Sequence, residues 1–231
     1  MPADYRLAMH KTVEPSILYF GTPVALIGSE NEDGSANLAP ISSAWWLGWN
    51  CVLGFGARSH TPQNLLRTGE CTINLPSVDQ VAEVDALART TGSDPVPPHK
   101  VAMGYRSEPD KFACAGLTPM PSLVVRPPRV AQCPVQMEGV VVHSHAVGRE
   151  SPEEPARLLA IEVRIVRVHV EESLLRPGTD HRIDPLAWRP LMMSFCQFFG
   201  LGEILHSSRL AEIPESAYTP PHLLRARAAQ T

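Results

Sequence analysis

The sequence has no run of about 18 apolar residues, and its first residues lack the apolar stretch of a secretory signal peptide. We therefore expect a soluble, cytoplasmic protein without a membrane partner. The net charge is −4, and the basic residues, of which only three are lysines, are scattered along the chain. Nothing in this charge pattern favours nucleic acid as a partner. Hydrophobic residues make up 44% of the 231 positions, which is enough for a sizeable core.

Paired cysteine motifs are also missing. The five cysteines are odd in number and form no CxxC pair: Cys51, Cys71, Cys114, Cys133 and Cys196. We interpret them as reduced and mostly buried thiols, which agrees with a cytoplasmic protein.

Motifs for a side-chain nucleophile or a metal are equally scarce. No Ser/His/Asp or Cys/His arrangement suggests covalent catalysis. His143 and His145 would lie on one face of a strand, a spacing that can bind metal, but no Cys, Asp or Glu nearby completes the set. We therefore predict no metal site and no catalytic side chain.

The apolar periodicity that is present is mainly that of β-strands. We predict strands at 26–29, 37–43, 50–56, 71–75, 122–126, 134–145 and 158–170. Helices are expected at 62–68, 78–90 and 190–205, and loops at 92–109, 150–155 and 176–190. In the last strand the apolar residues change face at Ile165 and Val166, which indicates a β-bulge that bends the strand around a barrel.

The block from residue 37 to 64 places the end of a strand beside the start of a helix. Thr61 and Pro62 suggest an N-cap followed by proline at the first helical position, and Gly69 suggests the helix end. A helix start attracts anions through its free N–H groups, and Arg58 and Ser59 precede it directly. The pattern fits a phosphate site, and it also fits an ordinary capped surface helix with an arginine nearby.

Several motifs in and around this block resemble the flavin reductase-like proteins of the FMN-binding split-barrel superfamily. They are Asp33-Gly34, Asn37-Leu38-Ala39-Pro40-Ile41-Ser42, Ser59-His60-Thr61-Pro62-Gln63-Asn64, Gly69-Glu70-Cys71, Asn74-Leu75, Asp110-Lys111-Phe112 and Ala115-Gly116-Leu117. The resemblance covers about residues 15 to 210. It implies a mainly β protein with inserted helices: a Greek-key-like split β-barrel of six to seven strands, in one domain spanning 1–231. The tail from about residue 214 is expected to be extended.

The resemblance also implies a cofactor site and a partner. FMN would bind at a homodimer interface, with its phosphate near the helix start, its pyrimidine edge on the strand end, and Lys111 in contact with the flavin. The expected site residues are Asn37, Ala39, Pro40, Ile41, Ser42, Ser43, Trp45, Phe55, Gly56, Ala57, Arg58, Ser59, His60, Thr61, Asn64 and Lys111. For Trp45, stacking on the flavin, lining a dimer groove and simple core packing remain open.

Two departures from the family pattern bear on function. Ser59-His60 stands where many members have Lys-Asp, so Arg58 is expected to replace the missing lysine at the phosphate. Ala156 stands where many NAD(P)H-oxidising members have histidine. We therefore carry two hypotheses: an FMN-dependent oxidoreductase that takes electrons from NAD(P)H to a small-molecule or protein acceptor such as free flavin, and a flavoredoxin-like FMN carrier without productive NAD(P)H oxidation.

Overall fold

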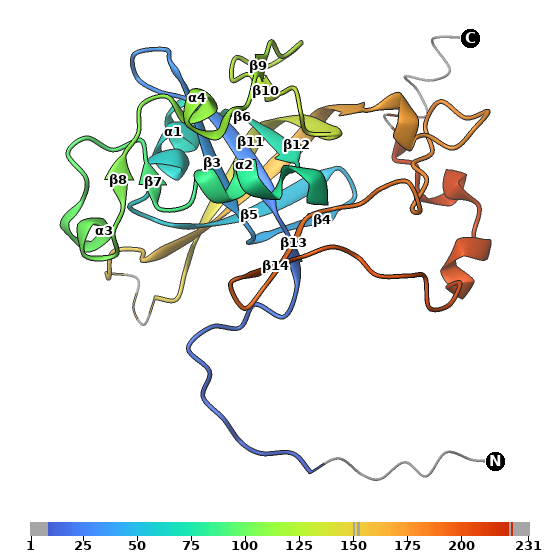
Figure 1. Cartoon of the computed structure of the whole chain (residues 1–231), viewed down its shortest axis with the longest axis horizontal. Helices are drawn as coiled ribbons and strands as arrows, with labels where there is room; N and C mark the ends of the chain where they lie inside the picture. The colour runs from blue at the N-terminus through green and yellow to red at the C-terminus, as the bar shows by residue number, and fades with distance from the viewer. Residues whose placement is uncertain (1–8, 150, 152, 222, 224–231) are drawn as a thin grey trace.

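A computed structural model describes residues 9–149, 151, 153–221 and 223, and a seven-stranded antiparallel sheet lies at its centre (Figure 1). Across the sheet the strands are β3 (Ala36–Ile41), β2 (Ala25–Glu30), β6 (Glu70–Leu75), β11 (Val135–Val147), β12 (Leu158–Val170), β5 (Asn50–Gly56) and β4 (Ala44–Leu47). The prediction of a mainly β fold with six to seven strands in its sheet is confirmed. β4 was not foreseen as a strand of its own.

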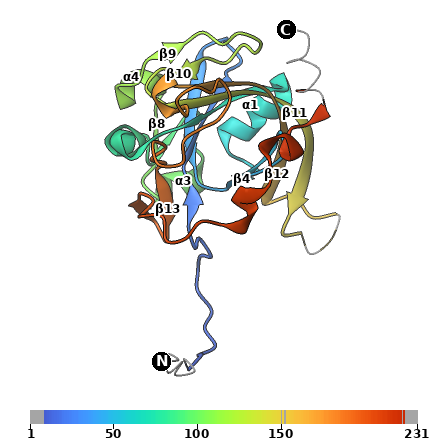
Figure 2. The same ribbon diagram turned by 90° about the vertical axis from the view of Figure 1, so that its right-hand side faces the viewer.

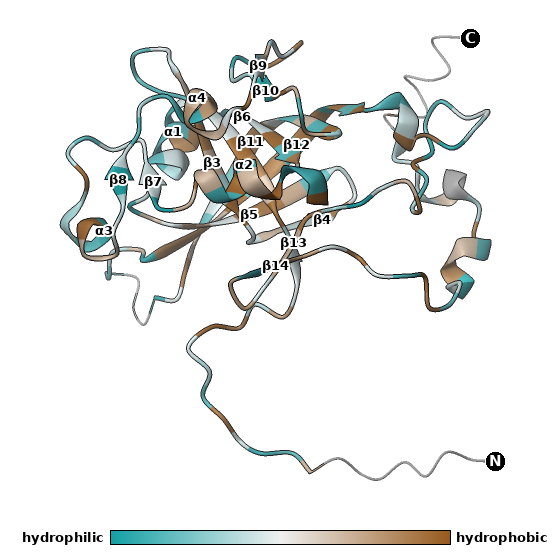
Figure 3. Ribbon diagram, in the orientation of Figure 1, coloured by the Kyte–Doolittle hydropathy of each residue, from teal (hydrophilic) through white to brown (hydrophobic). Residues whose placement is uncertain are grey.

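Alternating side chains explain why these segments form a sheet with a buried inner face. In β5, Cys51, Leu53 and Phe55 are buried while the residues between them are partly exposed. Ile161 and Val163 of the neighbouring β12 join the same cluster. Hydrophobic residues accordingly concentrate on the central strands, whereas the β2–β3 turn is hydrophilic (Figure 3).

The sheet curves because its two longest strands carry bulges. Glu138 pairs with Arg167 and Gly139 pairs with Ile165, so Val166 has no partner across the ladder. The predicted bulge is therefore confirmed, and Figure 2 shows the β11–β12 pair curving along one side of the molecule. At the end of the edge strand β3, the chain folds back so that Gly54 of β5 donates to the Ser43 carbonyl at 2.7 Å.

Helices cover both faces of this sheet. α1 (His60–Thr68) packs Leu65 into the hydrophobic cluster that contains Leu53 and Ile161, which we call the inner cluster. The helix ends at Gly69, whose φ of 72° is the left-handed conformation expected at a glycine helix stop. On the other face, α2 (Val81–Ala86) and α4 (Lys111–Ala115) bury Val84 and Phe112 against β2 and β3 in a second cluster. α3 (Pro98–Ala102) lies to one side, near the far end of the β11–β12 pair (Figure 1).

The predicted helix at 190–205 is wrong. The segment forms a short hairpin, β13 (Met192–Ser194) and β14 (Gln197–Phe199), and β1 (Thr22–Pro23) pairs with β13. Phe195 and Cys196 make the turn with positive φ values of 45° and 63°. Two of the apolar side chains at helical spacing, Met193 and Phe198, instead pack against the second cluster.

The predicted strand at 122–126 is also wrong. Leu123 and Val124 are largely exposed, and the main-chain N–H groups of 123–125 donate to the buried carboxylate of Glu138 at 2.7–3.1 Å. A carboxylate thus satisfies the groups that a neighbouring strand would have paired. Two short flanking strands, β9 (Pro119–Met120) and β10 (Arg129–Val130), pair with each other.

The predicted helix at 78–90 forms only in part. Its capping box at Ser77 and Gln80 is present, but a 3-10 turn, η1 (Val78–Gln80), precedes α2, and the helix ends at Ala86. Arg89 then has a φ of 53°, and β7 (Thr90–Thr91) pairs in parallel with β8 (Arg106–Ser107). The expected loop at 92–109 therefore contains α3 and β8.

The other expected loops, 150–155 and 176–190, form no helix or strand within the described residues. η2 (Glu172–Leu174) and η3 (Arg209–Glu212) are short 3-10 turns. The tail predicted as extended begins with another, η4 (Glu215–Tyr218), and residues 222 and 224–231 lie outside the described residues.

All five cysteines are free, and Cys51, Cys71 and Cys133 are buried, as predicted. In the described part of the chain, no helix is long and apolar enough to cross a membrane.

Candidate functional site

The ends of β3 and β5, the start of α1 and the connection from α2 to α3 enclose a cavity of ≈ 400 Å³, which we call the inner cavity. Twelve of the predicted cofactor residues line it: Asn37, Ala39, Pro40, Ile41, Ser42, Ser43, Phe55, Gly56, Ser59, His60, Thr61 and Lys111. The motifs separated in sequence are therefore brought to one place by the fold.

A buried network of hydrogen bonds fixes α1 against the β2–β3 hairpin. The side-chain amide of Asn37 donates to the hydroxyls of Ser29 at 3.0 Å and Thr61 at 3.1 Å. The amide of Asn64 donates to Ser29 at 3.3 Å and to the side-chain oxygen of Asn31 at 2.9 Å. Because each of these polar groups has a partner, the helix start is held rigidly relative to the strand end.

The helix start faces the cavity without a side-chain cap. α1 begins at His60, two residues before the predicted position, and its N-cap is Ser59 rather than Thr61. The Ser59 hydroxyl makes no capping hydrogen bond, and the Thr61 hydroxyl accepts from Asn37. Free N–H groups and the partial positive charge of the helix end therefore lie at the cavity wall.

The inner cavity is strongly basic. Arg89, Lys100 and Lys111 line it together with His60, and no aspartate or glutamate among the described residues lines it. Lys111 is 2% exposed, and its ammonium group donates to the carbonyl oxygen of Leu38 at 3.3 Å. Burial, reinforced by the charge of Lys100, lowers the pKa of Lys111 to about 8. An anion in the cavity would relieve this repulsion.

Close contacts of His60 and of Tyr19 help to define the shape of the inner cavity. A methyl group on Gly92 would lie 2.5 Å from Cδ2 of His60, so glycine is required for the connection to pass this ring. The His60 ring is in turn held at Nε2 by Asn31 at 2.8 Å. Burial, followed by the charges of Lys111 and Lys100, lowers the pKa of His60. At the opposite edge the Tyr19 hydroxyl lies 3.1 Å from the Ser43 hydroxyl.

Four predicted site residues do not line the inner cavity. Asn64 is a buried member of the network that holds α1, and Trp45 is 54% exposed on the edge strand β4. Ala57 and Arg58 line a neighbouring cavity instead, because the chain after β5 turns away from the inner cavity before α1 begins. Trp46, next to Trp45, packs against the inner cluster.

Sequence reasoning missed nine lining residues, most of them from the segment that follows α2. They are Tyr19, Gly54, Leu87, Arg89, Thr90, Thr91, Gly92, Lys100 and Tyr105. One signal was available, because two of the three lysines in the chain, Lys100 and Lys111, line this one cavity.

A second cavity of ≈ 620 Å³, which we call the outer cavity, adjoins the inner one. The two cavities share Gly56, Ser59, Lys100 and Tyr105 in their linings. The outer cavity is completed by α3 and by residues 155–157, which lead into β12. Ala156, at the position where a histidine was considered in the sequence analysis, lines the outer cavity.

The histidine pair does not form part of either cavity. The rings of His143 and His145 are 6.2 Å apart and tilted by 47°, and both residues are exposed on β11. Within the described residues, no group of three or more His, Cys, Asp or Glu side chains is placed to hold a metal ion.

A model of the flavin reductase like domain matches residues 17–198. The uncharacterized protein YdfE of Bacillus subtilis (strain 168) is 36% identical over 192 residues, which cover 83% of this chain and 89% of that protein. Flavoredoxin of Desulfovibrio vulgaris (Miyazaki F) is 23% identical with a TM-score of 0.71, covering 89% of this chain and 100% of that one. A candidate flavin reductase of Shewanella frigidimarina with a split barrel domain is 19% identical with a TM-score of 0.65, covering 81% and 86%. The fold is therefore a split barrel.

Proposed function

The chain belongs to the flavin reductase-like domain family, a family of flavin-linked redox proteins, and on this premise we propose that it binds FMN in the inner cavity and serves as an oxidoreductase. The observation that carries this proposal is a set of cationic side chains beside a helix start, in a cavity that no carboxylate of the described part of the chain lines. A phosphate monoester and a flavin ring that becomes anionic on reduction both suit such a site.

The residues present fit the two ends of FMN. The helix start at Ser59 and Thr61, with Lys100 nearby, offers hydroxyl, N–H and ammonium donors to the phosphate. At the other end, main-chain polar groups of Ala39 and of 41–43 and the buried ammonium of Lys111 are suited to the polar edge of the ring. Bound FMN supplies the chemistry by accepting and releasing electrons, and the protein orients it and sets the charge around it.

We propose NAD(P)H as the electron donor and a small molecule, such as free flavin, or a protein as the acceptor. The outer cavity supports this proposal because it shares four lining residues with the inner one, so a second ligand there would lie next to the flavin site. A flavoredoxin-like carrier is the second candidate. The specific observation in its favour is Ala156 in the outer cavity, at the position where many NAD(P)H-oxidising relatives have histidine.

We further propose a homodimer with the FMN sites at the subunit interface. Trp45 and Leu47, two residues apart and so on one face of the edge strand β4, are 54% and 72% exposed and form an apolar surface there. Phe20 and Phe195 stack edge to face with ring centroids 4.9 Å apart at the protein surface. A second copy could cover these apolar surfaces by the same contacts in both directions.

Reduction without air distinguishes the two candidates. The FMN-loaded protein is mixed with NADH or NADPH under anaerobic conditions, and the visible flavin band is followed. Bleaching at a rate that saturates with nucleotide supports the oxidoreductase. A flavin band that persists with both nucleotides but disappears with dithionite supports the carrier. Failure of the protein to take up FMN at all would contradict both.

A further inference from the structure

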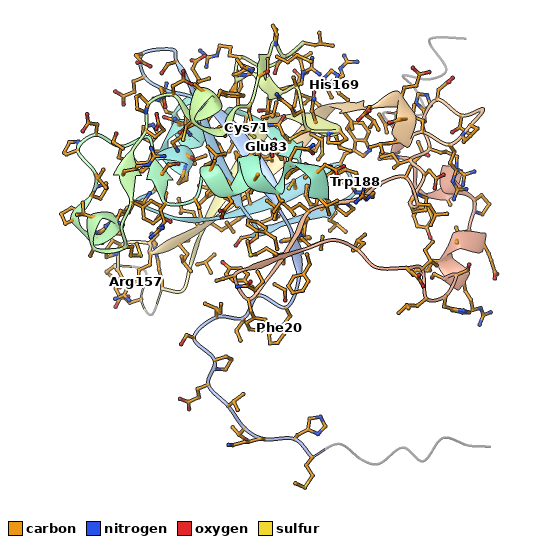
Figure 4. All side chains as sticks on the ribbon, in the orientation of Figure 1. Phe20, Cys71, Glu83, Arg157, His169 and Trp188 are labelled. Carbon is orange, nitrogen blue, oxygen red and sulfur yellow. The ribbon has the colours of Figure 1, made fainter. Side chains whose placement is uncertain are left out.

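A third cavity lies between the β9–β10 hairpin and the neighbouring ends of β11 and β12, and we call it the hairpin cavity. Its volume is ≈ 240 Å³. Among the described residues it shares none of its lining with the inner or the outer cavity. Figure 4 shows His169, one of its lining residues, toward the upper edge of the molecule near β9 and β10. A ligand bound here would therefore leave the proposed FMN site open.

Arg129 brings a positive charge into the wall of the hairpin cavity. The residue is only 9% exposed. Its Nη1 donates to the side-chain oxygen of Gln136 at 2.7 Å, and Nε and Nη2 donate to the carbonyl oxygen of Pro121 at 3.3 and 2.9 Å. These acceptors are neutral, and within the described residues Arg129 has no ion pair. The charge is therefore buried without a counter-charge, and a bound anion would supply one.

Hydrogen bonds fix the Arg129 guanidinium before any ligand arrives. The side-chain nitrogen of Gln136 donates to the carbonyl oxygens of Val130 at 2.8 Å and Cys133 at 2.9 Å, which turns its oxygen toward Arg129. The guanidinium carries more N–H groups than its three hydrogen bonds use, so donors remain for a ligand. Because the side chain is already ordered, binding does not have to order it.

Glu138 and Glu171 lie close to the hairpin cavity, and neither forms an ion pair with Arg129. Glu138 accepts from the N–H groups of 123–125 and from Nε2 of His169 at 2.7 Å, so its oxygens are occupied. The same contact holds the His169 ring and leaves its Nδ1 edge for a ligand. Glu171 lines the cavity but is exposed, so solvent screens its charge more than that of Arg129. The cavity therefore favours an anion.

The remaining wall of the hairpin cavity identifies the kind of anion. Met120, Pro134 and Val170 line it beside Arg129 and offer apolar surface. Cavities for drug-sized ligands measure about 300–1,000 Å³, so a cavity of ≈ 240 Å³ suits a smaller molecule. An inorganic oxyanion would use only the guanidinium. An organic carboxylate would use both parts, because its oxygens can accept from the guanidinium while its hydrocarbon part is buried.

We propose that the hairpin cavity binds a small organic carboxylate, with the carboxylate on Arg129 beside His169 and the hydrocarbon part against Met120 and Val170. This proposal goes beyond the flavin chemistry, since the described lining residues of the inner and outer cavities take no part in it. It also gives a role to an arginine that the fold buries without a counter-charge.

The test follows the amide signals of isotope-labelled protein by NMR while butyrate is added. Butanamide, which has the same carbon chain and no charge, and inorganic phosphate are titrated in parallel. Arg129→Gln removes the buried charge, and Arg164→Gln is its control, because Arg164 is exposed on β12 and lines none of the three cavities.

A second variant keeps the test decisive if Arg129→Gln does not fold. Ala131→Leu fills the hairpin cavity and leaves every hydrogen bond of Arg129 in place. Ala146→Leu is its control, because Ala146 is exposed on β11 and lines none of the three cavities. Glu171→Gln removes the one exposed carboxylate among the described lining residues.

We expect butyrate to shift the signals of 129–136 and 169–171 saturably in the wild-type protein, and butanamide and phosphate to bind at least about 10-fold more weakly. Arg129→Gln and Ala131→Leu should each weaken butyrate binding by about 10-fold or more, whereas the two controls should match wild type. Glu171→Gln should bind butyrate at least as tightly as wild type, because a repulsive charge is removed.

Four results would overturn the proposal. They are no saturable shift at these residues with butyrate, butanamide binding as tightly as butyrate, phosphate binding more tightly than butyrate, or Ala131→Leu binding butyrate as tightly as the Ala146→Leu control. The titration is made with flavin-free and with FMN-treated protein. Failure of FMN to bind would contradict the proposed function and leave the test of the hairpin cavity unchanged.

Discussion

The ammonium group of Lys111 donates to the carbonyl oxygen of Leu38 at 3.3 Å, joining the first turn of α4 to the middle of β3 across 73 positions of sequence. Lysine is rarely this deeply buried without a carboxylate partner, and within the residues that the structure describes no carboxylate lines the cavity beside it. The contact places a positive charge at the wall of the inner cavity before any ligand arrives. That arrangement is costly for the free protein and favourable for one that binds an anion.

Replacing Lys111 by methionine should stabilise the flavin-free protein near neutral pH. The pKa of Lys111 is lowered to about 8 in the folded state, whereas in the unfolded chain it stays near 10.4. Between these values the unfolded chain binds more protons, so wild-type stability rises with pH. The gain from Lys111→Met should therefore be about 3 kcal/mol below pH ~8 and vanish above pH ~10. Urea unfolding of both proteins at the two ends of this range measures it; a gain independent of pH would contradict the assignment.

Gly92→Ala should damage the site and the fold together. The added methyl group would lie 2.5 Å from Cδ2 of His60 and 3.0 Å from Oδ1 of Asn37, and hydrogen bonds hold both side chains in place. We expect a loss of about 1–3 kcal/mol in unfolding free energy and weaker FMN uptake. Gly202→Ala is the matched control, because its methyl group would meet nothing within 4 Å. Equal behaviour of the two variants would show that the contact with His60 is not tight.

Glu138→Gln should loosen the loop at 121–127. Burial favours the neutral carboxyl, but hydrogen bonds from the N–H groups of 123–125 and from the His169 ring outweigh it, so the pKa of Glu138 is lowered. Its stabilisation is therefore present above its ordinary pKa and lost as the pH falls through the folded-state pKa. We expect a loss on the order of 3 kcal/mol near neutral pH.

The same substitution should matter less in acid, because the wild-type carboxylate becomes protonated there. Urea unfolding near neutral pH and at a series of lower pH values, until the wild-type stability stops falling, compares the two conditions. Glu203→Gln provides the control, since Glu203 is exposed. A deficit that is as large in acid as at neutral pH would mean that the charge of Glu138 is not what holds the loop.

Leu47→Lys should weaken self-association without unfolding the chain. Leu47 is 72% exposed on an edge strand, so lysine is readily accommodated in the monomer but would be buried at an interface of two copies. Light scattering should give twice the chain mass of 25.3 kDa for wild type and a mass that falls on dilution for the variant. A wild-type mass equal to one chain at micromolar concentration rules out the proposed dimer.

Much of the sheet was predictable because its strands alternate in burial and the apolar residues of β12 change face at its bulge. The errors arose where other interactions outweighed local periodicity. Apolar side chains at helical spacing in 190–205 are separated by the positive-φ turn at Phe195 and Cys196. The main-chain N–H groups of the apolar run at 122–126 donate hydrogen bonds to the carboxylate of Glu138, which lies on β11. Neither interaction is visible from the spacing of apolar residues.

The site was predicted in part for a similar reason. The strand-end motif and the helix start meet as expected, because both are adjacent to the same sheet edge. Arg58 was assigned to the phosphate because it precedes the helix in sequence, yet it lines the outer cavity. Lys100 was missed because it reaches the inner cavity from α3, a helix inside an expected loop.

The central claim is that the inner cavity binds a flavin through its phosphate, and a comparison of FMN with riboflavin tests it most directly. Flavin fluorescence is titrated with flavin-free protein for each compound, since the two differ only in the phosphate. FMN should bind with one molecule per chain, and riboflavin should bind at least about 10-fold more weakly. Equal affinities for the two compounds, or no binding of FMN, would contradict it.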